Sequence, residues 1–157
     1  MTNQNIIFDL MGVLLMKNLN PITKQFDYLP VNFSEIIKLL KLCKKSGNKL
    51  FILSNLSTET YERIKDDEQI ASLFSFFDGM IISGMTPYKK PDPRIFSIFC
   101  STFHVDPQTA IFIDDKHDNC LSAATVGINR TINCEEFNLV QIAQRLIEYG
   151  AILTETE

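Results

Sequence analysis

The feature that most constrains this fold is the alternation of short apolar runs with segments of helical periodicity along 157 residues. Most of these runs lack the strict alternation of strands that have one face in water. Such runs are typical of parallel strands that helices cover on both faces. We therefore expect strands over residues 5–10, 49–55, 78–83, 110–115 and 128–133.

Segments with apolar side chains at helical spacing lie between these runs. One begins after Ser34 and ends at Gly47, and another has Asp92 as N-cap and Pro93 at its first helical position. Strand–helix alternation with short connections predicts an α/β fold, a doubly wound and mainly parallel five-stranded sheet with helices on both faces. The remaining helices are expected over residues 58–73, 118–127 and 139–150.

Composition and charge argue against several classes of function. The net charge of −4 disfavours non-specific binding to nucleic acid or to an anionic membrane. No stretch is long enough to span a bilayer or resembles a signal peptide, so we expect a cytoplasmic protein. The four cysteines share no metal-ligand spacing, and three lie in apolar periodic stretches, which indicates a reducing compartment.

Polar side chains gather where the expected strands end, and ligands of doubly wound sheets bind at those ends. A carboxylate nucleophile with further carboxylates nearby suits magnesium-assisted phosphoryl transfer, because Mg²⁺ prefers oxygen ligands and offsets the charge of phosphate. A hydroxyl, an amide and a lysine can bind phosphate oxygens. The candidates at the strand ends, or in the turn after the third strand, are Asp9, Ser54, Asn55, Lys90, Asp114 and Asp115.

Four segments resemble, in order, the motifs of the haloacid dehalogenase-like (HAD) superfamily: IIFDLMGVLL, FILSN, KKPDPRIF and IFIDDKHDNCLSAATVGIN. The resemblance implies a HAD-like Rossmannoid core in which Asp9 attacks phosphorus and water hydrolyses the aspartyl-phosphate. It implies that Ser54 and Lys90 act on the phosphate, with Asn55 beside them in the second motif. It also implies an Mg²⁺ cofactor bound by Asp9, the backbone carbonyl of Met11 and Asp115.

The chain departs from the superfamily two residues after the nucleophile, where a second Asp usually protonates the leaving group and then activates water. Met11 occupies that position and keeps only the backbone carbonyl. General acid–base catalysis is worth about 10²- to 10⁴-fold, or roughly 3–5 kcal/mol of barrier. We therefore expect slow turnover and a long-lived phosphorylated Asp9. His117 is the one candidate replacement acid nearby, and Asn119 stands where many relatives carry a further acid.

A second departure concerns the cap domain that many members insert. Residues 16–32 and 57–77 are too short for a domain, and we expect one helix in the second segment. We predict a single capless domain over residues 1–157 with an open site. Such a site suits a phosphorylated small molecule or protein as substrate, or a partner chain that closes it. The apolar residues 74–77 are core, or a homodimer contact where exposed.

Three functions remain open. The first is a weak Mg²⁺-dependent phosphohydrolase that uses Asp9. The second is a catalytically inactive binding protein on the same scaffold, which Met11 favours. The third is a dehalogenase-type hydrolase, since such relatives also lack the second Asp. Retention of Asp9, Ser54, Lys90 and Asp115 favours the first.

Overall fold

Five parallel strands form the central sheet of the computed structural model, which describes residues 2–154. Each neighbouring pair in the order β5-β4-β1-β6-β7 is parallel, which confirms the predicted α/β fold. Every expected strand is present, with ends shifted by a few residues. The strands are β1 (Asn5–Phe8), β4 (Lys49–Ser54), β5 (Gly79–Ile82), β6 (Ala110–Asp114) and β7 (Arg130–Asn133).

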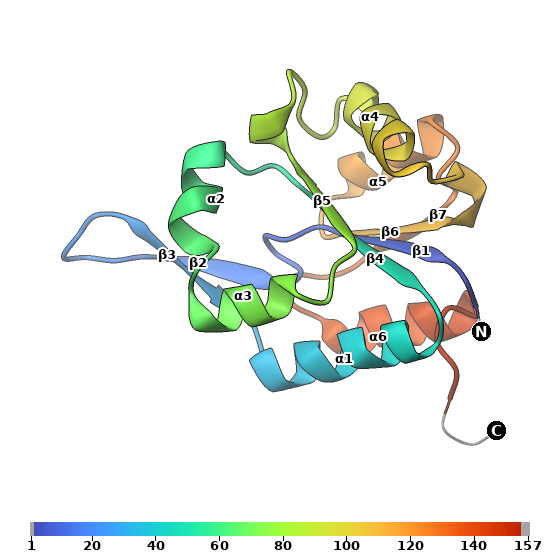
Figure 1. Ribbon diagram of the computed structural model, residues 1–157, viewed down its shortest axis with the longest axis horizontal. Helices are drawn as coiled ribbons and strands as arrows, with labels where there is room; N and C mark the ends of the chain where they lie inside the picture. The colour runs from blue at the N-terminus through green and yellow to red at the C-terminus, as the bar shows by residue number, and fades with distance from the viewer. Residues whose placement is uncertain (1, 155–157) are drawn as a thin grey trace.

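Helices cover both faces of the sheet. In Figure 1, α1 and α6 lie on one face while α4 and α5 lie on the other. Two short 3₁₀ turns, η1 (Ser83–Met85) and η2 (Pro107–Thr109), precede α4 and β6. No helix in residues 2–154 is long and apolar enough to cross a membrane. The helices are α1 (Phe33–Lys45), α2 (Thr58–Ile64), α3 (Glu68–Phe74), α4 (Pro93–Phe103), α5 (His117–Thr125) and α6 (Leu139–Glu148).

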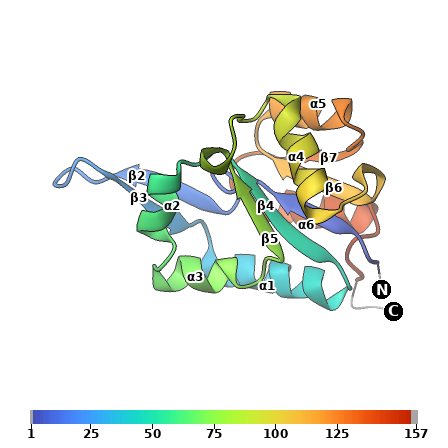
Figure 2. The same ribbon diagram turned by 45° about the horizontal axis from the view of Figure 1, so that its top comes forward.

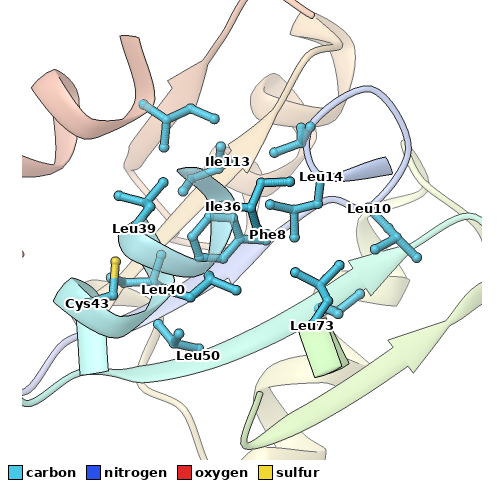
Figure 3. Packing of buried hydrophobic residues seen from close by; sticks show 14 of the residues in the cluster. Phe8, Leu10, Leu14, Ile36, Leu39, Leu40, Cys43, Leu50, Leu73 and Ile113 are labelled. Carbon is cyan, nitrogen blue, oxygen red and sulfur yellow. The ribbon is translucent and has the colours of Figure 1, made fainter. Parts of the chain in front are cut away.

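The alternation of side chains along β1 divides the core into two layers. Ile6 and Phe8 pack with the apolar faces of α1, α3 and α6. Figure 3 shows Phe8 among the labelled side chains of this layer, with Ile36 and Leu40 of α1 near it. Ile7 points to the opposite face and packs with the apolar side chains of α4 and α5. Because both faces are buried, the sheet is held firmly and its strand ends are fixed in space.

A β-hairpin follows β1, where the sequence predicted only a connection. Its strands β2 (Leu15–Leu19) and β3 (Phe26–Pro30) are antiparallel and project away from the sheet beside α2 (Figures 1 and 2). Arg63 of α2 fixes the hairpin, because its guanidinium donates to the Phe26 carbonyl at 3.0 Å and lies over the Tyr28 ring. The prediction missed it because these strands are largely exposed and lack a long apolar run.

The segment between β4 and β5 holds two short helices, so the prediction of one helix over residues 58–73 was wrong. Asp67 separates them, since its side chain caps α3 by accepting from the backbone N–H groups of Gln69 and Ile70, each at 3.1 Å. Asp and Asn are favoured at helix N-caps, so Asp67 carried a signal that the periodicity concealed. Phe76 and Phe77 are partly buried against the core.

Candidate active site

Asp9 lies just beyond the end of β1, in the middle of the sheet. Its backbone N–H donates to the Ile113 carbonyl of β6 at 2.9 Å, which continues the parallel pairing past the end of the strand. Its side chain is 9% exposed. The strands on both sides therefore hold this carboxylate at the carboxyl edge of the sheet, as the sequence predicted.

Lys90 connects three strand ends through its ammonium group. Nζ donates to Asp9 Oδ1 at 2.8 Å, to Asp114 Oδ2 at 2.9 Å and to the Leu53 carbonyl at 2.8 Å. The side chain is 1% exposed, so all three of its N–H bonds are matched in a site that water scarcely reaches. A buried ammonium between two carboxylates requires this pairing, because an unpaired charge there would be strongly destabilising.

Asn55 holds the backbone of Lys90 in place. The Lys90 N–H donates to Asn55 Oδ1 at 2.8 Å, and Asn55 Nδ2 donates to the Lys90 carbonyl at 2.9 Å. This reciprocal pair ties the turn before α4 to the end of β4. The sequence predicted Asn55 as a substrate-binding residue; the side chain lines the cavity, and its amide holds Lys90.

The two acids at the end of β6 have different surroundings. Asp114 is fully buried and accepts from Lys90, from the Lys116 backbone N–H and from Asn119 Nδ2. Asp115 is partly exposed, and its Oδ1 is buried without a hydrogen-bond partner. Asp114 therefore supports Lys90 and the loop, while Asp115 has a carboxylate oxygen free to bind a ligand.

Burial and charge shift the pKa values of these groups. Burial raises the pKa of Asp9 to about 7, although the Lys90 ammonium works in the opposite direction. Burial would lower the pKa of Lys90, but the carboxylates of Asp9 and Asp114 outweigh it and raise that pKa. Burial, helped by the Asp114 carboxylate, also raises the pKa of Asp115. Three carboxyl groups around one ammonium leave uncompensated negative charge, which favours a cation.

A cavity of about 460 Å³ opens above these residues. We call one side of it the polar wall, which consists of Asp9, Ser54, Asn55, Lys90, Asp115 and Asn119. We call the other side the apolar wall, which consists of Met11, Leu15, Met16 and Phe137. Except for Asp114, every candidate residue at the strand ends and in the turn before α4 lines this cavity, as does Met11. His117 does not line it, so the one expected replacement acid lies outside.

Sequence reasoning missed the residues of the hairpin and of the loop after β7. Leu15, Met16 and Lys17 come from the unpredicted β2, and Lys116 follows Asp115. The hairpin could have been suspected from residues 20–25, a polar turn-like stretch between apolar positions. Glu136 and Phe137 also line the cavity, and no local pattern marks them.

The Met11–Gly12 turn packs directly on Asp115. Gly12 has a φ of +86°, and a Cβ on it would lie 2.5 Å from Asp115 Oδ2. A glycine is required here both by the left-handed backbone and by this close approach. The turn therefore brings the Met11 backbone beside Asp9 and Asp115.

These residues fit a hard divalent cation. Asp9, Asp114 and Asp115 each offer an oxygen, and the three oxygens lie within 4.8 Å of one another. Both Asp114 oxygens already accept hydrogen bonds, whereas Asp115 Oδ1 has no partner. Ser54 Oγ is the other buried side-chain polar atom without a partner among residues 2–154. Both atoms adjoin the cavity, so the site has an orphan acceptor for a cation and an orphan hydroxyl for an anion.

Sequence similarity to known proteins covers more than half of the chain. A model of the haloacid dehalogenase-like hydrolases matches residues 31–127, a range that includes Ser54, Lys90 and Asp115. Phosphoglycolate phosphatase 1 of Pseudomonas aeruginosa is 24% identical over 94 residues, which are 59% of this chain and 33% of that protein. The chain spans about half or less of the length of the curated relatives that it matches.

Solved structures share the fold over nearly the whole chain. A HAD-like family hydrolase of Porphyromonas gingivalis superposes with a TM-score of 0.74 at 21% identity, covering 94% of this chain and 98% of that one. A HAD family enzyme of Bacteroides thetaiotaomicron, solved as a magnesium complex, superposes with a TM-score of 0.69 at 18% identity. That match covers 87% of this chain and 95% of the other.

Proposed function

Because the chain belongs to the haloacid dehalogenase-like hydrolases, we propose that it is an Mg²⁺-dependent phosphohydrolase that acts through a phosphorylated Asp9. The observation that carries the proposal is the surroundings of the Asp9 carboxylate, which include one ammonium bound to it and two buried oxygen atoms without hydrogen-bond partners. Asp9 is held at 2.8 Å from the Lys90 ammonium, and Ser54 Oγ and Asp115 Oδ1 lack partners. A phosphate and a cation would satisfy both orphan atoms.

Each side chain has a role in this mechanism. Asp9 attacks phosphorus, while the Ser54 hydroxyl donates to one phosphate oxygen and the Lys90 ammonium offsets the charge that develops. Asp9, the Met11 carbonyl and Asp115 would hold Mg²⁺. Bound there, the ion would neutralise phosphate charge, so that an anionic carboxylate can approach.

Met11 would slow the second step of this mechanism, the hydrolysis of phospho-Asp9. In this mechanism nothing on the Met11 side chain can donate a proton to a leaving oxygen or accept one from water. Asp9 would therefore be phosphorylated readily only by a donor whose leaving group needs no proton. Hydrolysis of phospho-Asp9 would then depend on water losing its proton to solvent. Its rate would be roughly 10²- to 10⁴-fold lower than with a general base.

Met11 also supports a second candidate function, that of a binding protein that holds a phosphorylated ligand without turnover. The same polar wall would bind the phosphate, and the missing acid–base group would prevent hydrolysis. The dehalogenase-type alternative is less well supported, because Asp115 and Lys90 provide for a cation and a phosphate that carbon–halogen cleavage does not use.

The test is hydrolysis of p-nitrophenyl phosphate in saturating Mg²⁺, comparing the wild type with Asp9→Asn. An aryl leaving group needs little protonation, so this substrate tolerates Met11. We expect activity that falls at least about 10³-fold in Asp9→Asn and disappears in EDTA. Asp66→Asn, an exposed acid in the turn between α2 and α3, is the matched control and should retain full activity. Equal rates in wild type and Asp9→Asn would reject the phosphohydrolase in favour of the binding protein.

A further inference from the structure

The apolar wall lies where the superfamily resemblance places an acid–base group, which raises the question of what it contacts. Met11 is partly buried against the core, and Leu15, with which it forms an isolated β-bridge, is fully buried. Gly12 N–H donates to the Leu15 carbonyl at 2.9 Å, so the turn and the start of β2 form one unit. This unit borders the same cavity as Asp9.

Phe137 completes this wall from a distant part of the chain. Its N–H donates to the Gly12 carbonyl at 3.0 Å, which ties the loop after β7 to the turn after Asp9. Its φ of +60° lies in the left-handed region, which is uncommon for a bulky residue and is found where surrounding structure imposes it. The fold thus holds an aromatic residue at the cavity despite backbone strain.

The charged residues that also line the cavity, Lys17, Lys116 and Glu136, are all solvent-exposed. The Lys17 ammonium lies 4.7 Å from the centroid of the Phe26 ring, so it is already engaged with the hairpin. Apart from the polar wall, therefore, the buried and half-buried surface near Asp9 is apolar. A leaving group seated against the apolar wall would meet thioether, aliphatic and aromatic side chains.

Resting on the proposed function, we infer that the substrate class is a phosphoryl donor whose leaving group is both apolar and able to depart without a proton. An acyl phosphate with a hydrocarbon chain is the simplest member. The P–O bond to the acyl oxygen breaks, both electrons go to the departing carboxylate, and an Asp9 Oδ–P bond forms. Water then attacks phosphorus, the bond to Asp9 breaks, and one proton is released to solvent. Phosphorylation of Asp9 therefore needs no group that Met11 lacks, whereas hydrolysis of phospho-Asp9 proceeds slowly without a general base.

Three phosphate compounds separate the two requirements. Octanoyl phosphate and acetyl phosphate have similar leaving groups but differ in chain length, whereas octyl phosphate keeps the chain and has a poor leaving group. We expect kcat/KM for octanoyl phosphate to exceed that for acetyl phosphate about tenfold or more, since methylenes in an apolar pocket are discriminated at that level. Octyl phosphate should be the poorest by at least 10²-fold. The rate of Asp9→Asn is subtracted as background.

Variants of the wall test its part directly. Met16→Gln and Phe137→Asn should each lower the ratio of kcat/KM for octanoyl phosphate to that for acetyl phosphate several-fold. Asn is chosen at position 137 because it tolerates a positive φ. Ile22→Gln is the matched control, because Ile22 is 89% exposed at the hairpin turn and lies outside the cavity. Thermal unfolding of each variant shows whether it is folded.

The outcomes distinguish a failure of the inferred substrate class from a failure of the proposed phosphohydrolase function. Asp9-dependent turnover with acetyl phosphate equal to or better than octanoyl phosphate would overturn the inference and leave the phosphohydrolase intact. Octyl phosphate turned over as fast as octanoyl phosphate would overturn it too, because a proton donor would then be present. Absence of Asp9-dependent turnover of all three compounds would overturn both.

Discussion

The polar wall and the apolar wall face the same cavity but are stabilised differently. Around Asp9 the polar wall is a buried network in which one ammonium reaches two carboxylates and a backbone carbonyl. The apolar wall comes from a projecting hairpin and a loop, held by backbone hydrogen bonds through Gly12. The first is a group of buried charges, whereas the second includes Met11, the residue at which the chain departs from the first motif. Under the proposed function, the two walls would separate phosphate binding from proton transfer within one site.

Removing the ammonium should have the largest effect on the polar wall. Lys90→Met leaves Asp9 and Asp114 buried without their counter-charge, which costs about 3–5 kcal/mol of unfolding free energy. Urea denaturation in EDTA measures it, and Lys89→Met at the exposed neighbouring position should change stability by less than about 0.5 kcal/mol. Adding Asp9→Asn should recover part of the loss. If the double variant is no more stable than Lys90→Met, the charges do not account for the network.

Restoring the acid should have the next largest effect, on the apolar wall. Met11→Asp places a carboxyl group two residues after the nucleophile, so turnover of octyl phosphate should rise about 10²-fold or more. Met16→Asp puts the same group on a neighbouring residue of that wall and serves as the control. An equal rise in both variants, measured by phosphate release, would mean that added charge and not position is responsible.

The pH dependence of stability should show a smaller effect. The pKa of Asp9 is raised from 3.8 to about 7 in the folded chain, so the folded state holds a proton that the unfolded state has lost. Stability from this group is therefore greatest below pH 3.8 and is lost as pH rises through 7. Between pH 5 and pH 8 the metal-free protein should lose about 3 kcal/mol from Asp9 alone.

The measurement is the free energy of unfolding at both pH values in EDTA. Asp9→Asn should flatten the profile, and Mg²⁺ should stabilise the wild type more at pH 8 than at pH 5, because it binds the ionised carboxylate. A wild-type profile that rises with pH, and that Asp9→Asn leaves unchanged, would contradict the burial of Asp9 as the cause.

The sheet and the polar wall were predictable because both follow from apolar runs and from what ends them. Asp9, Ser54 and Asp115 were expected together since the carboxyl ends of parallel strands meet at one edge. The choice of partners was not predictable. That Lys90 joins Asp9 to Asp114, while Asp115 keeps a free oxygen, depends on side-chain directions at the ends of neighbouring strands.

The apolar wall was beyond sequence reasoning for two physical reasons. The hairpin strands are largely exposed, so β2 and β3 lack the continuous apolar run that marked the central strands. Phe137 reaches the cavity through a left-handed backbone and a hydrogen bond to Gly12, and a single sequence shows neither. Met11 alone pointed to this region, because it departs from the motif.

The central claim is that Asp9 can be phosphorylated but is dephosphorylated slowly because Met11 cannot act as a base. The direct measurement is the fraction of protein carrying phosphate on Asp9, by mass spectrometry of acid-quenched samples after mixing with acetyl phosphate and Mg²⁺. The account predicts that most of the wild-type protein is phosphorylated at steady state, little of Met11→Asp, and none of Asp9→Asn. A wild type that turns over acetyl phosphate through Asp9 while carrying no more phosphate than Met11→Asp would contradict it.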